Sequence, residues 1–214
     1  MKRLLSIIIL FAILVACKND KKSGGEQAGT DKPAIDSTLV TDSTWGPITA
    51  ATNFDELKKI YGDSNVKDER ICGPECIDSL DVTKIYPNTA KEIIVHWKDS
   101  AYHKSIGLLQ CYQEGFPYHT GNGIKAGSTM TDLLRINEKK ISFSGFGWDY
   151  GGNIISYNGG KLDSLACRFR LDYKGQHDDN VLMGDIEVDT DMPDVKTRLD
   201  KIVVYQFTMG FYKE

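Results

Sequence analysis

The stretch that decides the fold is ITAATNFDELKKI at residues 48–60, because it returns 76 positions later as IKAGSTMTDLLRI at residues 124–136. The two segments align without gaps, and isoleucine, alanine, a hydroxyl residue, an apolar residue, an acid, leucine, a cation and isoleucine recur in register. Chance similarity between two amphipathic helices is an alternative. Because the match extends upstream of the helical part, we interpret it as an internal duplication.

Each copy predicts a short helix with a defined start. Asn53 and Thr129 can act as N-caps, and Glu56 and Asp132 lie three residues further on, as a capping box requires. The apolar positions recur at helical spacing, which predicts one inward-facing side for each helix. These sides consist of Phe54, Leu57 and Ile60 in the first helix and Met130, Leu133 and Ile136 in the second.

Strand-like segments follow each predicted helix, and turn signals such as Asn158-Gly159-Gly160 separate them. A last short helix is expected around residues 194–199, with Pro193 at its start. Short helices packed on one face of an antiparallel sheet define an α+β class, so we predict two tandem related units, 45–122 and 123–214. The predicted strands are 81–86, 92–97, 106–112, 141–150, 153–157, 165–173, 183–188 and 202–212, and residues 66–79 are expected to form a loop.

The first residues predict an export signal. Lys2 and Arg3 precede an apolar run at residues 4–16, which is shorter than the roughly 20 residues that a membrane-spanning helix needs. The run ends in Leu14-Val15-Ala16-Cys17, which looks like the bacterial lipobox. We therefore expect residues 1–16 to be a lipoprotein signal peptide and Cys17 to be lipidated. The alternatives are an ordinary secretory signal with a chance cysteine, or an uncleaved anchor.

The stretch 17–44 is rich in glycine, serine, threonine, aspartate and lysine and has few large apolar residues. Such a composition predicts a flexible tether that joins the lipid anchor to a folded domain. Lys18 gives no inner-membrane retention signal of the enteric kind, and Asp20 followed by two lysines matches acidic surface-export tags poorly. The expected location is the outer membrane, facing the periplasm, with surface exposure as the alternative.

The charge balance bears on the partners of the protein. The formal net charge is −4, and removal of residues 1–16 takes away Lys2 and Arg3, which leaves about −6. No basic patch stands out, so nucleic acid is not an expected partner. The expected partners are the membrane, through the N-terminal lipid, and an envelope protein.

Four cysteines remain after Cys17, and an even number in an exported domain suggests disulfides. Cys72 and Cys76 flank a turn-like Gly-Pro-Glu, and Cys111 and Cys167 lie in apolar, strand-like runs. Three connectivities are open. We favour 72–76 together with 111–167. A zinc site is the weaker alternative, since the CxxxC spacing differs from the common CxxC knuckle.

The most distinctive segment is SFSGFGWDYGG at residues 142–152. On a strand, Phe146, Trp148 and Tyr150 would share one face, and Asp149 would lie on the other face with the glycines. Aromatic residues with polar groups are favoured in interfaces, so Phe146, Trp148, Asp149 and Tyr150 are the candidate binding residues. In the alternative interpretation the aromatic stripe is core beneath the second helix.

No motif predicts catalysis or a cofactor. The carboxylates of the segment 189–194 lack the glycine turn of a calcium loop, so no metal site is expected there. No GxSxG, HExxH or phosphate-binding loop occurs. We therefore expect a protein that is not an enzyme, with a hydrolase of unrecognised site as an alternative. The histidines, none in a metal-ligand pattern, are His96, His103, His119 and His177.

A resemblance rests on the repeated helix-then-sheet unit and on the string FGWDYGG at residues 146–152. The unit resembles the β-lactamase-inhibitor-protein-like superfamily, whose relatives include small outer-membrane lipoproteins of the barrel-assembly machinery. The whole chain resembles uncharacterised lipoproteins of Bacteroidota. The resemblance covers roughly residues 48–214 and implies a non-catalytic binding or inhibitor-like scaffold. A structural accessory lipoprotein of an outer-membrane complex is the alternative. No inhibitor contact residue carries over, because no local motif matches.

Overall fold

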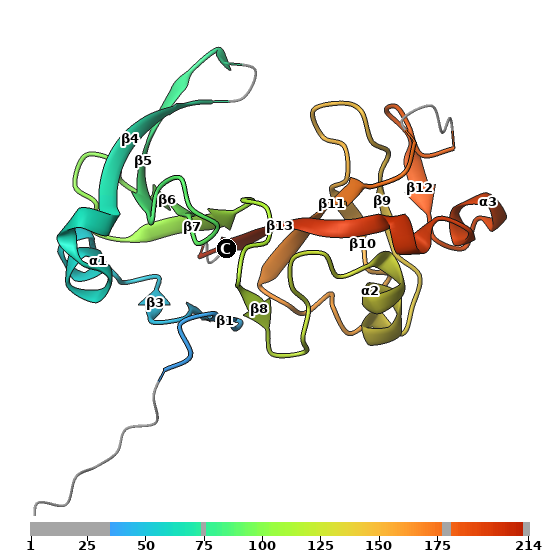
Figure 1. Cartoon of the computed structure of the whole chain (residues 1–214), viewed down its shortest axis with the longest axis horizontal. Coiled ribbons are helices and arrows are strands. Elements are labelled where there is room, and N and C mark those ends of the chain that lie inside the picture. The colour runs from blue at the N-terminus through green and yellow to red at the C-terminus, as the bar shows by residue number, and fades with distance from the viewer. Residues whose placement is uncertain (1–34, 74–75, 177–180, 212–214) are drawn as a thin grey trace, which may run out of the picture. The chain divides into compact units, whose positions relative to one another are not determined.

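The computed structural model describes residues 35–73, 76–176 and 181–211 (Figure 1). The predicted signal peptide 1–16, the predicted lipidation site Cys17 and most of the predicted tether lie outside these residues. The folded unit begins at Ile35, and strands lie within the part of the predicted tether up to residue 44. Residues 35–44 of the predicted tether therefore belong to the folded unit.

Both predicted capping boxes are present. Helix α1 (Phe54–Tyr61) begins at Asn53, whose Oδ1 accepts a 3.0 Å hydrogen bond from the backbone N–H of Glu56. Helix α2 (Met130–Asn137) begins at Thr129, whose backbone N–H donates a 3.0 Å hydrogen bond to Asp132. Each box satisfies backbone donors that have no partner within the helix, which explains why two eight-residue helices form at these positions.

The local structure before the two helices also repeats. The Thr52 hydroxyl accepts a 3.0 Å hydrogen bond from the backbone N–H of Thr49. The Ser128 hydroxyl accepts a 3.1 Å hydrogen bond from the backbone N–H of Lys125, at the same offset along the sequence. The two aligned segments therefore share a turn as well as a helix. A duplication origin and the boundary between two units at residues 122 and 123 stay predictions.

The fold is α+β, as predicted. A six-stranded antiparallel sheet has the order β11-β13-β7-β6-β5-β4, and two smaller sheets have the orders β3-β2-β1-β8 and β10-β9-β12. A further short helix, α3 (Pro193–Lys196), begins at proline, as predicted. The strands are β1 Leu39–Val40, β2 Thr44–Trp45, β3 Ile48–Thr49, β4 Val66–Cys72, β5 Ser79–Ile85, β6 Ile93–Trp97, β7 Ile106–Cys111, β8 His119–Thr120, β9 Ser142–Ser144, β10 Ile154–Ser156, β11 Cys167–Tyr173, β12 Glu187–Asp189 and β13 Ile202–Gly210.

The register of the six-stranded sheet separates a core face from an open face. Residues directly opposite each other in an antiparallel sheet point to the same side. One row contains Phe169, Phe207 and Cys111, all buried in the main core together with Leu57 of α1 and Met130 of α2. The neighbouring row points away from this core and consists of Lys67, Lys84, Ile94, Gln110, Thr208 and Arg168.

Two secondary-structure predictions were wrong. Residues 66–79 were expected to form a loop, but β4 pairs with β5 from Val66 to Cys72, so this segment is half of a hairpin. The sequence did not predict strand β4 because its residues are mostly charged. An edge strand with two exposed faces lacks the apolar alternation of a half-buried strand. The expected strand 141–150 ends at Ser144, and a turn follows it.

The inward-facing side of the first helix was also predicted incorrectly. Leu57 is fully buried, but Ile60 is 43% exposed. The helix is short and ends one residue later, so the core does not extend beneath Ile60. Within the described residues, no helix has the length and apolarity that a membrane crossing requires.

One predicted disulfide is present and the other is wrong. Cys72 and Cys76 are bonded, with their Cα atoms 4.9 Å apart. Cys111 and Cys167 are free and buried. Cys111 lies opposite Phe207 and Cys167 lies opposite Met209, so strand β13 separates them. Strands in a sheet are spaced about 4.8 Å apart, and a disulfide cannot bridge two such spacings.

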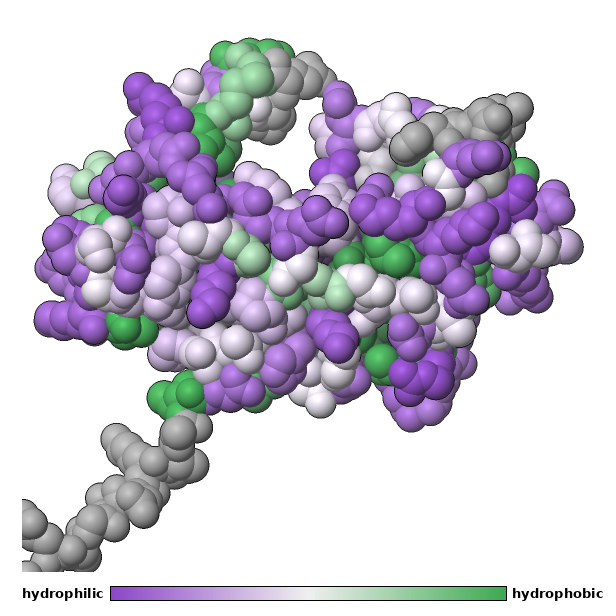
Figure 2. All heavy atoms as spheres, in the orientation of Figure 1, coloured by the Kyte–Doolittle hydropathy of each residue, from purple (hydrophilic) through white to green (hydrophobic). Residues whose placement is uncertain are grey.

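The end of the β4–β5 hairpin extends beyond the sheet (Figure 1). Strand β6 pairs with β5 only over residues 83–85, so the outer part of the hairpin has two strands. Ile77 is 77% exposed and Leu80 is 39% exposed, and Figure 2 shows apolar surface gathered at the end of this hairpin. The Cys72–Cys76 bond closes the hairpin at this end.

Candidate binding site on the open face of the sheet

The four candidate binding residues of the 142–152 segment separate in the structure. Phe146 is core, with 6% of its surface exposed, and its ring stacks on Tyr173 at 5.8 Å between centroids. Trp148 is half-buried, whereas Asp149 and Tyr150 are exposed. Asp149 and Tyr150 line a depression of about 640 Å³ on the open face of the sheet. The core interpretation therefore applies to Phe146, and the surface interpretation applies to Asp149 and Tyr150.

The turn that carries Asp149 and Tyr150 is fixed against β11. The backbone N–H of Leu171 donates a 2.8 Å hydrogen bond to the carbonyl oxygen of Gly152, and Gly152 donates one of 2.9 Å to Ser144. Gly152 has a φ of +75°, and a Cβ atom there would lie 2.0 Å from the carbonyl oxygen of Leu171. Only glycine fits this position without a shift of the backbone.

Trp148 supports the turn from within. Its indole Nε1 donates a 2.8 Å hydrogen bond to the carbonyl oxygen of Gly145. Its ring meets that of Tyr150 edge to face, with centroids 5.4 Å apart. Trp148 therefore positions the exposed tyrosine. It does not line the depression.

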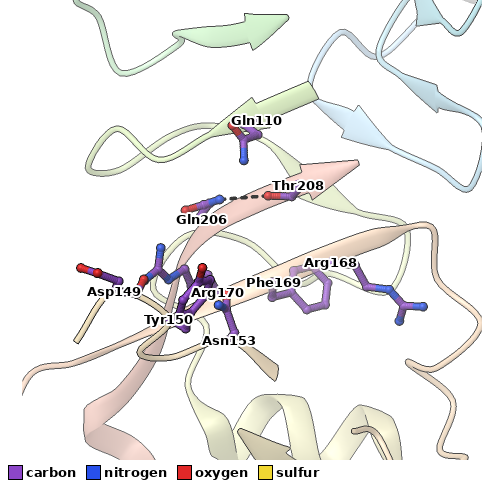
Figure 3. A pocket seen from close by; sticks show the side chains of 9 residues that line it. All are labelled: Gln110, Asp149, Tyr150, Asn153, Arg168, Phe169, Arg170, Gln206 and Thr208. Carbon is purple, nitrogen blue, oxygen red and sulfur yellow. Dashed lines mark hydrogen bonds between the residues drawn. The ribbon is translucent and has the colours of Figure 1, made fainter. Parts of the chain in front are cut away.

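Arg170 of β11 lines the depression. Its Nε donates a 2.8 Å hydrogen bond to the carbonyl oxygen of Gly151, and its Nη2 donates to the carbonyl oxygen of Asp149. The guanidinium is thus held by two backbone carbonyls of the turn. Figure 3 shows the guanidinium groups of Arg170 and Arg168 extending in different directions from the same strand.

A bulge in β13 adds a second aromatic residue to this face. Arg170 pairs with Gln206 and Leu171 pairs with Val204, so Tyr205 is the extra residue. A bulge of this kind can turn two successive side chains to the same side. The Tyr205 ring lies 5.9 Å from the Arg170 guanidinium, and its partial burial raises the pKa of the Tyr205 hydroxyl.

The neighbouring strands contribute uncharged polar groups. Gln206 donates a 2.9 Å hydrogen bond to the Thr208 hydroxyl (Figure 3). Gln110 of β7 is 2.9 Å from the Nε2 atom of His96 on β6. Burial lowers the pKa of the His96 imidazole, although the hydrogen bond to Gln110 acts in the opposite direction. The neutral form of His96 is therefore favoured beside the depression.

Arg168 lies at the rim of the depression. Its Nη1 donates a 3.3 Å hydrogen bond to the carbonyl oxygen of Asp163, and its guanidinium lies 5.7 Å from the Tyr157 ring. Tyrosine and arginine are enriched among the residues that dominate binding energy in protein interfaces. The open face combines them with amides and hydroxyls, which suits the recognition of another polypeptide.

The carboxylate of Asp149 lines the depression, whereas the described thiols and imidazoles lie apart from it or are occupied. The thiols of Cys111 and Cys167 are buried, which raises the pKa of both. His103 stacks on Trp97 at 4.9 Å between centroids, and His119 lies 3.4 Å from a carboxylate oxygen of Asp36. His177 is outside the described residues. Among the described residues no three acids, histidines or cysteines converge to hold a metal ion.

Sequence reasoning missed Arg168 and Arg170, the two cations of the site. A signal was present, since the segment CRFRLDY at residues 167–173 alternates buried and polar positions. This alternation predicts that both arginines share the face opposite Phe169. The position of the 149–152 turn beside them could not be predicted, because it depends on contacts between residues distant in sequence.

Comparison with known proteins gives a structural likeness and shows no family. No protein-family model matches the chain, and no curated protein matches it. A solved structure with a similar arrangement is the crystal structure of the uncharacterized protein yfeY from Escherichia coli, with a TM-score of 0.48 and 11% sequence identity. The match covers 81% of this chain and 99% of that chain.

Proposed function

We propose that the protein is a lipid-anchored envelope lipoprotein that binds another protein through the open face of its six-stranded sheet. The observation that carries this proposal is Arg170, whose guanidinium is fixed by the carbonyl oxygens of Gly151 and Asp149 in an open depression. Exposed Tyr150 and half-buried Tyr205 lie in the same region of the face. A fixed cation beside tyrosines is a typical centre of a protein interface.

Binding without catalysis is the second part of the proposal. A nucleophilic thiol needs a thiolate and an approach for the substrate, and burial works against both at Cys111 and Cys167. The only described histidine beside the depression, His96, is bonded to Gln110. The resemblance of the repeated unit to inhibitor-like scaffolds agrees with a binding role.

The anchor sets where the binding would occur. Acylation of Cys17 with two or three chains would hold the protein on a membrane stably, because each buried methylene contributes about 0.8 kcal/mol. We place it at the outer membrane, facing the periplasm. Metabolic labelling with a radioactive fatty acid checks this part: the wild-type protein should be labelled, and Cys17→Ser should not. Equal labelling of the wild-type protein and Cys17→Ser would contradict lipidation at Cys17.

Photo-cross-linking in the native cells tests the binding role. A photoreactive amino acid at position 150 of the full-length protein should yield one discrete adduct with a second protein. Position 135 is the control, because Arg135 is exposed on α2 and does not line the depression. Identification of the cross-linked protein would separate an inhibitor-like role from an accessory role in an outer-membrane complex. Equal adducts at both positions, or none at position 150, would contradict the proposal.

A further inference from the structure

Among the described residues, two arginines of the open face differ from Arg70 and Arg135 because they have no carboxylate partner. Arg70 is 3.1 Å from Asp81, and Arg135 is 3.5 Å from Asp132. Arg168 and Arg170 form no ion pair within 4.0 Å in the part of the chain that the structure describes, and both donate to backbone carbonyls instead. Their charge is therefore available to a ligand with a negative group.

Arg170 is also arranged in advance for such a ligand. Its Nε and Nη2 atoms bind carbonyl oxygens of the turn, while its Nη1 group has no hydrogen-bond partner among the described residues. Fixing an arginine side chain before binding reduces the entropy lost when the complex forms. The free end of the guanidinium can donate parallel hydrogen bonds to the two oxygens of a carboxylate.

The surroundings favour a peptide carboxylate over a phosphate. Gln110, Asn153 and Gln206 present amide groups, which match the donors and acceptors of a polypeptide backbone. The exposed carboxylate of Asp149 lies at the same depression, and it would repel a doubly charged phosphate more than a singly charged carboxylate. The arginines diverge, so they suit two separate acidic side chains.

We infer that the partner presents an extended acidic segment, and that Arg170 binds one of its carboxylates end-on. Arg168, two residues away on β11, attracts a second acidic side chain at the rim. This inference rests on the proposed function and names the chemistry of the partner. A protein whose own net charge is −4 carries here a local cationic site, so electrostatic complementarity makes the open face selective for acidic segments.

The test uses the full chain in detergent and measures the ¹H–¹⁵N signals of arginine side chains by NMR. The probe is a hexaglutamate peptide, with hexaglutamine as the neutral control and inorganic phosphate as the competing anion. Hexaglutamate should shift the Arg170 Nε–H signal and leave the Arg135 signal nearly unchanged. In Arg170→Gln, apparent affinity for hexaglutamate should fall about tenfold, as expected for loss of a hydrogen bond between charged groups. Arg135→Gln, which makes the same change in charge, should retain the affinity.

Equal shifts at Arg135 and Arg170, or no shift with hexaglutamate, would overturn the inference. Stronger binding of phosphate than of hexaglutamate would also overturn it and would point to a lipid headgroup. These results are distinguishable from failure of the proposed function. A cross-link at position 150 without a response to hexaglutamate leaves a binding protein with another partner chemistry. A response without any cross-link leaves a carboxylate site without a protein partner.

Discussion

The Nε atom of Arg170 donates a 2.8 Å hydrogen bond to the carbonyl oxygen of Gly151, a residue nineteen positions earlier in the chain. This bond ties β11, the edge strand of the six-stranded sheet, to the turn after β9. The same turn receives the backbone hydrogen bond from Leu171 at Gly152. The orientation of Arg170 therefore depends on the conformation of a turn that contributes Asp149 and Tyr150 to the same depression.

Substitution of Gly152 should disrupt this arrangement. Gly152→Ala introduces a Cβ atom 2.0 Å from the Leu171 carbonyl oxygen at a φ of +75°. The backbone must shift, so we expect a loss of more than about 2 kcal/mol of unfolding free energy. Gly123→Ala is the matched control, because Gly123 has a φ of +86° and no atom within 4 Å of the added Cβ. It should cost about 1 kcal/mol. Urea denaturation measures both, and equal losses would contradict the role of the turn.

Substitution of Trp148 should affect partner binding at the site more than the packing of the core. Trp148→Phe keeps an aromatic ring but removes the 2.8 Å hydrogen bond to Gly145. We expect stability to fall by about 1 kcal/mol, the typical contribution of one hydrogen bond. We also expect the partner to bind more weakly, because the ring of Tyr150 loses its fixed neighbour. Thermal denaturation and partner affinity check the two effects. A stability loss of core size, about 3 kcal/mol or more, would show that the ring is part of the core.

The number of free thiols can be measured directly with a thiol reagent. Cys111 and Cys167 are free, and Cys72 and Cys76 are bonded. The chain, unfolded without reductant, should therefore react with two equivalents of a thiol reagent through Cys111 and Cys167, and lipidation of Cys17 as proposed would leave no third thiol. The folded protein should react slowly, because burial raises the pKa of both thiols. A result of no more than a trace of thiol in the unfolded chain would contradict the two free thiols and support the 111–167 disulfide that the sequence suggested.

These thiols also predict a pH dependence. A buried thiol stays protonated in the folded state, whereas in the unfolded state it loses its proton near its ordinary pKa of about 8.5. The unfolded state binds fewer protons above that pH, so stability should be constant below it and fall as pH rises. Urea midpoints between about pH 7 and pH 10 measure this. If Cys111→Ala loses less stability at alkaline pH than wild type does, part of the wild-type loss comes from this thiol. An equal loss of stability in the variant would contradict a contribution from Cys111.

His96, beside the depression, should make stability fall as pH decreases, whereas the buried thiols make it fall as pH increases. Burial lowers the pKa of His96, so the folded state resists protonation that the unfolded state accepts below about pH 6.5. Stability contributed by neutral His96 is present above this pH and is lost as pH falls. His96→Gln should reduce the acid sensitivity of the urea midpoint. Direct titration of the His96 imidazole by NMR should give a pKa below that of a model peptide, and a higher value would contradict the account.

Much of the fold followed from local signals, whereas the site did not. Asn53 and Glu56 form the first predicted capping box, and the pattern that specifies it lies within four residues. β4 was missed because its charged side chains lie at an open edge of the sheet. The 111–167 disulfide was wrong because spacing in the sequence does not reveal that β13 lies between the two cysteines.

The candidate residues of the site show the same limit. Residues 142–152 suggested one continuous strand with an aromatic stripe, but the glycines allow a turn that sends Phe146 into the core and Tyr150 to the surface. The alternation around Phe169 could have placed Arg168 and Arg170 on one face. Their hydrogen bonds to Asp163, Gly151 and Asp149 are tertiary contacts and needed the structure.

The affinity of the cross-linked partner for Arg170→Gln tests the central claim most directly. If the open face is the binding surface and Arg170 contacts the partner, the variant should bind the partner about tenfold more weakly than wild type. Arg135→Gln should bind it as wild type does. Equal affinity of wild type and Arg170→Gln, with an unchanged fold by circular dichroism, would contradict the account.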